Sequence, residues 1–236
     1  MMNELSAEVF PGGFRFIPGE ATFPLSTDTM VLADFVCLRP GSRVVDLGSA
    51  SGALGLLLCA KASGCTVTGI ELQESAHQAA LNNIRSNNLI HRLKSIHGDL
   101  RQIRQLLPAG AFDCVVSNPP YFSSGALSRA SSTARQEVTA TLTDIFTAAA
   151  WLLRTGGDFF LVHKPERLAD LMVLSREHHL EAKVLQTVCH RPGDIPALVL
   201  LHCRRGGKPG VRLSAPIALR ETDGSPSPHY RRIYHL

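Results

Sequence analysis

The chain has 236 residues, of which 44% are hydrophobic, and a formal net charge of +4. This length and apolar content suffice to bury the core of one full domain, and the low aromatic content favours an α/β protein. The mild charge argues against a uniformly basic nucleic-acid binder, so any basic surface must be local.

Two further classes of protein are disfavoured. No apolar stretch approaches the length of a membrane span, and the first residues lack the pattern of a signal peptide. The six cysteines show no C-x-x-C pairing and no histidine partner at zinc spacing. We therefore expect no membrane association, no metal site and a reducing, cytoplasmic environment.

The first 40 residues predict a short hairpin and a helix. Phe14 and Phe16 share one face of a two-residue period, and Pro-Gly pairs around them mark turns. Ser26, Thr27 and Asp28 are N-cap residue types, and the amphipathic stretch 29–36 follows them directly.

From residue 41 the pattern alternates between strands and helices, as in a Rossmann-type sheet. Predicted strands cover residues 43–47, 66–71, 93–97, 112–117, 158–163, 182–189 and 197–203. Predicted helices cover 53–62, 74–87, 141–153 and 167–178. The last two strands form a hairpin, so the final strand is expected to run antiparallel to the others.

The turn after the first of these strands predicts a ligand-binding loop. Asp46-Leu47-Gly48-Ser49-Ala50-Ser51-Gly52 joins the strand to a helix, where glycine lets the backbone approach a ligand and the helix N-terminus offers free N–H groups. The glycines also nearly match a dinucleotide fingerprint, so the loop alone does not separate a nicotinamide enzyme from other nucleotide binders.

Three more polar residues follow the next predicted strands. Glu71 closes the second strand, where an acidic side chain accepts hydrogen bonds from ribose hydroxyls. Asp99 follows the third strand, either as a ligand contact or as a helix N-cap, and Asn118 follows the fourth. Gly48, Glu71, Asp99 and Asn118 thus fall at the carboxyl ends of successive strands, where open α/β sheets bind ligands.

The sequence Asn118-Pro119-Pro120-Tyr121 predicts the chemistry. Two prolines fix φ and disfavour the α region for the residue before each, so Asn118 is held extended at the strand's end. An amide oxygen, a backbone carbonyl and an aromatic ring together suit the binding of a planar group through its –NH2.

Asn-Pro-Pro-Tyr resembles the catalytic motif of S-adenosylmethionine-dependent amino-methyltransferases, and Asp46 to Gly52 resembles their D-x-G-x-G-x-G loop, with Ala50 in place of the middle glycine. This resemblance implies a class I methyltransferase: a Rossmann-like, seven-stranded, mostly parallel sheet with an antiparallel last strand. It implies catalysis by Asn118, Pro119, Pro120 and Tyr121. It implies cofactor binding by Thr27, Asp28, Asp46, Gly48, Gly52, Glu71, Asp99 and Asn118.

Two flanking stretches narrow the resemblance. Residues 23–33 and Ala134-Arg135-Gln136-Glu137 are similar to the bacterial tRNA1(Val) adenine-N6 methyltransferase family, whose members methylate the adenosine just 3′ of the anticodon. Thr27 and Asp28 are assigned to the cofactor on this resemblance, and a plain helix cap explains them equally well. The implied substrate is a tRNA anticodon loop.

The pattern along the chain predicts three parts: a hairpin and helix over residues 1–40 packed on the catalytic domain, a methyltransferase domain over 41–205 and a basic tail over 206–236. From Cys189 to the end, seven Arg and one Lys face three acidic residues. A phosphate-facing surface and an ordinary solvated tail both account for that excess.

Four alternative functions remain compatible with parts of the sequence, which does not specify the oligomeric state. A protein-glutamine methyltransferase uses the same motif but usually carries an N-terminal helical domain for which this chain has no room. A guanine-N2 methyltransferase fits because the motif does not specify the ring. Ala50 and the mild charge also suit a non-catalytic protein that kept the fold. A nicotinamide-dependent dehydrogenase leaves Asn118 to Tyr121 without a purpose.

Overall fold

The computed structural model describes residues 8–9, 13–18, 25–121 and 140–234, with only the backbone for residues 8 and 9. The strands are β1 (Glu8–Val9), β2 (Arg15–Phe16), β3 (Arg43–Leu47), β4 (Thr66–Glu71), β5 (Leu93–His97), β6 (Phe112–Ser117), β7 (Leu153–His163), β8 (Leu180–Cys189), β9 (Leu198–Arg205), β10 (Arg212–Leu213) and β11 (Ile217–Ala218). The helices are α1 (Thr27–Phe35), α2 (Ala53–Lys61), α3 (Glu74–Ser86), α4 (Ile103–Leu106), α5 (Leu142–Leu152), α6 (Leu168–Glu177) and α7 (Pro228–Tyr234), with 3-10 turns η2 (Leu100–Gln102) and η3 (Pro165–Arg167).

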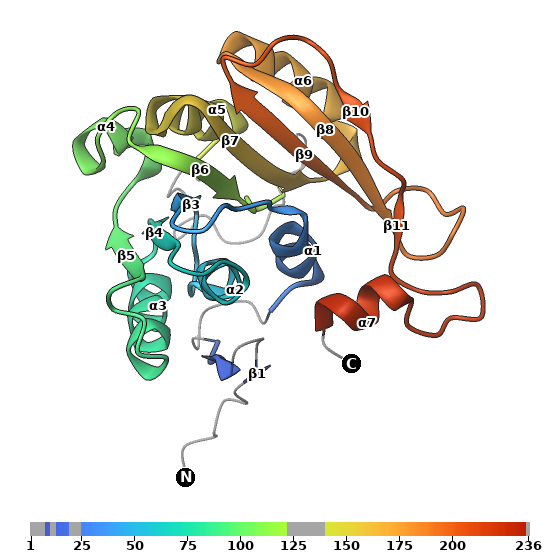
Figure 1. Ribbon diagram of the computed structural model, residues 1–236, viewed down its shortest axis with the longest axis horizontal. Helices are drawn as coiled ribbons and strands as arrows, with labels where there is room; N and C mark the ends of the chain where they lie inside the picture. The colour runs from blue at the N-terminus through green and yellow to red at the C-terminus, as the bar shows by residue number, and fades with distance from the viewer. Residues whose placement is uncertain (1–7, 10–12, 19–24, 122–139, 235–236) are drawn as a thin grey trace, which may run out of the picture.

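One mixed sheet organises the molecule (Figure 1). Its strands lie in the order β10-β8-β9-β7-β6-β3-β4-β5, and β11 pairs with β8. Strands β5, β4, β3, β6 and β7 are parallel, whereas β9 runs antiparallel between β7 and β8. The predicted α/β class and the antiparallel last strand are therefore confirmed.

The strand count exceeds the seven expected, because the main sheet has nine strands. The two additional strands, β10 and β11, have two residues each and pair parallel with β8. Strands this short carry no readable alternation of apolar and polar residues, so the sequence pattern could not predict them.

Alternation along each central strand divides the core into two layers. Val44 and Phe160 face a cluster with α1, α2, α3 and α7. Val45 and Phe159 face the opposite cluster with α5 and α6. The result is a sheet covered by helices on both faces, as expected for α/β proteins.

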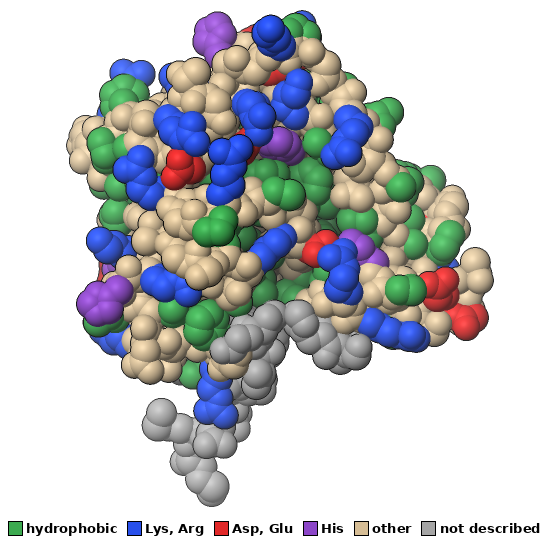
Figure 2. Space-filling model, viewed as in Figure 1, with side chains coloured by type: hydrophobic (Ala, Val, Ile, Leu, Met, Phe, Trp, Pro, Cys, Tyr) green, Lys and Arg blue, Asp and Glu red, His purple; other side chains and the backbone are tan. Residues whose placement is uncertain are grey.

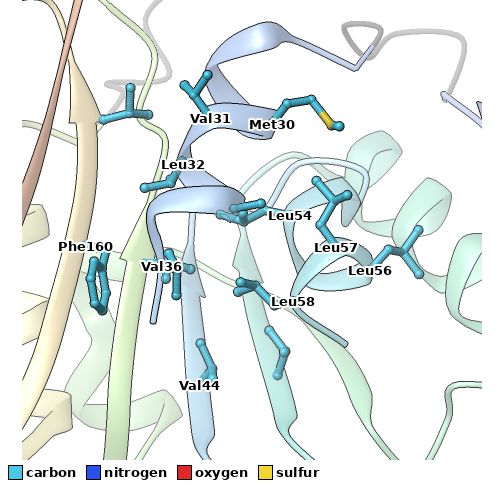
Figure 3. Close-up of a cluster of buried hydrophobic side chains, with 14 of the residues drawn as sticks. Met30, Val31, Leu32, Val36, Val44, Leu54, Leu56, Leu57, Leu58 and Phe160 are labelled. Atoms are coloured by element: carbon cyan, nitrogen blue, oxygen red, sulfur yellow. The ribbon is translucent and has the colours of Figure 1, made fainter. Parts of the chain in front are cut away.

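Helix α1 is positioned by its apolar side chains. Met30, Val31, Leu32 and Val36 are buried, and Figure 3 shows Leu32 and Val36 pointing towards the sheet. Ser26 caps the helix by accepting the N–H of Thr29 at 3.2 Å. Its N-terminal turn consequently sits at the edge of the sheet where β6 ends.

The segment after residue 205 joins the same fold. It supplies β10 and β11 to the sheet edge and ends in α7, which lies beside α1 (Figure 1). The proposed division at residues 40 and 205 stays a prediction. Among the described residues, no helix is long and apolar enough to span a membrane.

Candidate active site

Parallel strands bring the predicted ligand-binding residues to one edge of the sheet. Gly48 follows β3, Glu71 ends β4, Asp99 follows β5 and Asn118 follows β6, and these four strands are direct neighbours. Hydrogen bonds tie adjacent ends together, since Gly48 N–H donates to the carbonyl of Ile70 at 3.0 Å. The predicted convergence at this edge is what the structure has, while the role of each residue stays a prediction.

The loop after β3 is shaped by two glycines with left-handed backbone. Gly48 has φ of 76° and Gly52 has φ of 84°. A Cβ atom at Gly48 would meet no atom within 4 Å, so the space above the loop is open. Such an open backbone concavity fits a ligand that approaches closely.

Ala50 also adopts a left-handed conformation, with φ of 46°. This region costs a non-glycine residue of the order of 1–2 kcal/mol, so the residue that departs from the family pattern is a strained one. Its N–H donates to Glu71 Oε2 at 2.8 Å, which helps to hold the loop in place.

Glu71 is buried and doubly anchored. Its other oxygen, Oε1, accepts the N–H of Gln73 at 2.7 Å. A carboxylate fixed by two backbone donors is pre-oriented and still has lone pairs for ribose hydroxyls.

Asp46 lies inside β3, beneath the loop. Burial and the nearby negative charge of Glu71 raise the pKa of Asp46 to about 7. Its Oδ2 has no hydrogen-bond partner among the described residues, and neither has the hydroxyl of Ser49, which lines the same small internal cavity. A buried carboxyl with an unpaired oxygen favours a positively charged or hydrogen-bonding ligand nearby.

Asp99 serves as a helix cap in this structure. Its side chain accepts the N–H of Arg101 at 2.9 Å and forms an ion pair with the same residue's guanidinium group. Arg101 holds the pKa of Asp99 below its usual range. An adenine amino group at this strand end would share the carboxylate with Arg101.

The Asn-Pro-Pro-Tyr motif follows β6 and is held by the first turn of α1. Asn118 Nδ2 donates to Thr29 Oγ1 at 3.0 Å, and the Tyr121 hydroxyl donates to Asp28 Oδ2 at 2.6 Å. The same Tyr121 hydroxyl also lies 3.3 Å from Asn118 Oδ1. Because the single hydroxyl proton favours the shorter contact, Asn118 Oδ1 is left as an acceptor for a substrate amine.

Asp28 affects the chemical state of Tyr121. Burial, with the Asp28 carboxylate beside the hydroxyl, raises the pKa of Tyr121 above its ordinary value. The hydroxyl therefore keeps its proton and acts as an anchor. Thr27 instead contacts the end of the chain, with its hydroxyl 3.0 Å from that of Tyr234.

Two residues at the end of β7 complete the surroundings of Tyr121. The His163 ring packs edge-on against it at 5.2 Å, and Lys164 Nζ lies 5.1 Å from its ring centroid. Burial lowers the pKa of His163, so that imidazole is neutral at pH 7. A base stacking on Tyr121 must use the part of the ring that Lys164 leaves open.

Neither Thr29 nor Lys164 was assigned to the site from the sequence. In the sequence, Thr29 looks like an ordinary residue at the start of a helix. Its hydrogen-bond partner, Asn118, lies 89 positions further along the chain. The signal that could have found Lys164 is its place just after the fifth strand, in line with the other strand ends. The flanking residues 23–24 and 134–137 lie outside the described residues.

Comparisons with known proteins agree with this geometry. The family model "Methyltransferase small domain" matches residues 25–182. The chain belongs to this methyltransferase family. Similar curated relatives are the tRNA1(Val) (adenine(37)-N6)-methyltransferases of Tolumonas auensis, 30% identical over 92% of this chain and 90% of the relative, and of Aeromonas hydrophila, 28% identical over 89% and 87%. The resemblance expected from the sequence is confirmed.

Solved structures show the same fold. A predicted O-methyltransferase from Agrobacterium tumefaciens has a TM-score of 0.75 at 20% identity and covers 89% of this chain and 96% of its own. The 16S rRNA N2 G1207 methyltransferase of Thermus thermophilus, solved with AdoMet and guanosine, has a TM-score of 0.59 at 21% identity and covers 85% and 50%.

The methyltransferase depends on S-adenosylmethionine, and its own residues fit that cofactor. The open backbone at Gly48 would take the methionine part, Glu71 the ribose and Asp99 the adenine. When bound, S-adenosylmethionine supplies an electrophilic methyl group to the open edge beside Asn118.

Proposed function

We propose that the protein methylates the exocyclic N6 amine of an unstacked adenine in a tRNA anticodon loop. The observation that carries the proposal is the fixed orientation of Asn118, whose amide nitrogen is engaged by Thr29 while Oδ1 stays available. The names of the curated relatives support tRNA as the substrate and adenine as the acceptor.

The chemistry required of the protein is mainly positioning. The lone pair of an aromatic amine is delocalised into the ring, so the nitrogen is a poor nucleophile. Asn118 Oδ1 and the Pro119 carbonyl can each accept one N–H, which moves the nitrogen towards tetrahedral geometry and aims its lone pair at the methyl group.

Proton release needs no strong base in this site. As the N–C bond forms, the nitrogen gains positive charge and its N–H becomes acidic, and the proton leaves through Asn118 or the Pro119 carbonyl to water. The neighbouring groups agree with this scheme, because His163 has a lowered pKa and Tyr121 a raised one.

The position of the motif restricts the substrate. Asn118 lies at the end of a buried strand and is itself only partly exposed. A base inside a helical stack cannot reach such an atom, so the acceptor has to be an unpaired or flipped nucleotide. An anticodon loop offers such bases.

Nucleoside mass spectrometry of bulk tRNA from a strain lacking the gene tests this proposal. The expected result is the loss of N6-methyladenosine from one tRNA and its return when the gene is restored. Loss of a methylated guanosine would assign the guanine-N2 reaction instead. Unchanged tRNA with a missing methylglutamine in a release factor would reject the proposal.

A further inference from the structure

Beyond the catalytic motif, the same edge of the sheet carries the ends of β8 and β11. Strand β8 runs in the same direction as β7, so its last residue, Cys189, lies at the edge of the sheet that also carries Asn118 and Lys164. Backbone hydrogen bonds join the tail to this point, since Arg220 N–H donates to the carbonyl of His190 at 2.8 Å. Figure 1 shows β11 and α7 beside the end of β8.

Two arginines, Arg191 and Arg220, converge here and are called the arginine pair below. Arg220 Nη1 donates to the carbonyl of Gly224 at 3.4 Å, and Arg191 Nη2 would lie 3.5 Å from a Cβ atom at Gly224. Two guanidinium groups that approach one glycine repel each other unless an anion lies between or above them.

The arginine pair is exposed and makes no ion pair within the described part of the chain. Two nearby carboxylates accept backbone donors: Asp194 accepts the N–H of Arg191 at 2.9 Å, and Asp223 accepts that of Ser225 at 2.8 Å. Glu221, which follows Arg220 in the chain, forms no ion pair with either arginine in the described part of the chain. The guanidinium of Arg220 lies 5.4 Å from the ring of Tyr230, which holds it in place without neutralising it.

At the opposite edge of the sheet, where the parallel strands begin, several arginines form ion pairs. Figure 2 shows many lysine and arginine side chains at the top of the view, over the end of the molecule with α5 and α6. Several arginines at the amino ends of the strands are paired, with Arg154 on Asp113, Arg204 on Asp158 and Arg176 on Glu181. Asp158 lies about 17 Å along β7 from the active-site edge.

The spacing of these cations suits an RNA strand. Lys164 is one strand from Asn118, and the end of β8 is three strands away, which is about 14 Å at the usual strand separation. A stacked nucleic-acid strand advances about 3.4 Å per nucleotide, so about four nucleotides cover this distance.

We propose that the arginine pair, together with Lys164, binds backbone phosphates of the RNA substrate a few nucleotides from the methylated base. The inference rests on the proposed function and adds the surface by which the tRNA is held. Phosphate contacts of this kind fix the register of the RNA while the base itself enters the site at Asn118.

The test measures binding of an unmodified tRNA transcript by fluorescence anisotropy at several salt concentrations. It compares the full chain with R191Q/R220Q, R191K/R220K and the control R39Q. Arg39 is exposed, precedes β3 at the opposite edge and makes no ion pair among the described residues. Affinity for S-adenosylmethionine and the thermal melting curve are recorded for every variant to exclude misfolding.

The Gln variant is expected to bind tRNA about ten-fold more weakly and to lower the slope of log K against log salt by about one to two. The Lys variant should keep the slope, R39Q should match the wild type, and S-adenosylmethionine affinity should not change. If R191Q/R220Q keeps the wild-type affinity and salt slope, the proposal that the arginine pair binds RNA phosphates is wrong, while the proposed function is unaffected. Failure of the wild-type protein to bind tRNA would overturn the proposed function as well.

Discussion

Thr29 decides which end of the Asn118 carboxamide faces the open edge of the sheet. Its hydroxyl accepts Nδ2 at 3.0 Å and is itself 3.0 Å from the hydroxyl of Ser26, so the acceptor is fixed by the helix cap. The N-cap of α1 is thus coupled to the orientation of the catalytic amide, a link between local helix chemistry and catalysis.

Replacing Thr29 with Val should remove that acceptor at nearly constant volume. We expect kcat for methyl transfer to fall about 10- to 100-fold, because a misaligned amide no longer holds the amine in place. The KM for tRNA should stay within a few-fold. Thr29→Ser, which keeps the hydroxyl, is the matched control and should restore most of the rate; a Val variant with wild-type kcat would contradict the positioning role.

Asp46 makes stability depend on pH. Burial raises its pKa from 3.8 to about 7, so the folded state binds a proton more tightly than the unfolded state does. The protonated Asp46 carboxyl therefore stabilises the folded state fully below about pH 4, and this contribution to the free energy of unfolding is lost as the pH rises through about 7.

Asp46→Asn should remove this dependence. Between about pH 5 and about pH 8, the wild type should lose of the order of 2 kcal/mol more free energy of unfolding than the Asn variant. Urea denaturation at each pH measures both proteins. Parallel pH profiles would show that Asp46 does not titrate in this range.

At the level of elements, α1 connects the C-terminal helix to the catalytic motif. Arg232 of α7 makes two hydrogen bonds to Asp34 near the end of α1, at 2.8 and 2.9 Å, while Tyr234 reaches Thr27 at its start. Asp28 and Thr29 of the same helix hold Tyr121 and Asn118. The tail beyond residue 205 consequently braces the active site as well as carrying basic residues.

Ile233 is the buried anchor of α7, with 5% of its surface exposed. Ile233→Ala should lower the free energy of unfolding by about 2–3 kcal/mol through lost burial and a residual cavity. Chemical denaturation measures the change. Val173→Ala, at a site that is 56% exposed on α6, is the control and should change it by less than about 0.5 kcal/mol. Equal effects in the two variants would refute a packing role for α7.

At the level of the whole molecule, apolar runs and strand-end residues predicted the sheet and the placement of Gly48, Glu71 and Asn118. These predictions succeeded because buried parallel strands have a local signature, and their carboxyl ends must meet at one edge. Strands β10 and β11 were not predicted, because a strand of two residues has no periodic pattern of apolar and polar side chains. The role of Thr29 was not predicted because its contact with Asn118 spans 89 positions and leaves no local pattern. Lys164 stands in line with the other strand ends, but that position alone did not reveal its contact with Tyr121.

Ala50 shows a different limit of the sequence. An alanine in place of a family glycine can have either a relaxed or a strained backbone, and the sequence does not say which. The observed φ of 46° at Ala50 shows that this backbone is strained. The arginine pair is similar, since the positive excess after Cys189 did not reveal which arginines stay unpaired or where they meet.

Nucleoside mass spectrometry of an unmodified tRNA transcript after incubation with the purified protein and S-adenosylmethionine tests the central claim most directly. The wild type should produce N6-methyladenosine at one loop position, and Asn118→Ala should produce none while its S-adenosylmethionine affinity stays within a few-fold. Full methylation by Asn118→Ala, or methyl groups found only on guanosine, would contradict the account.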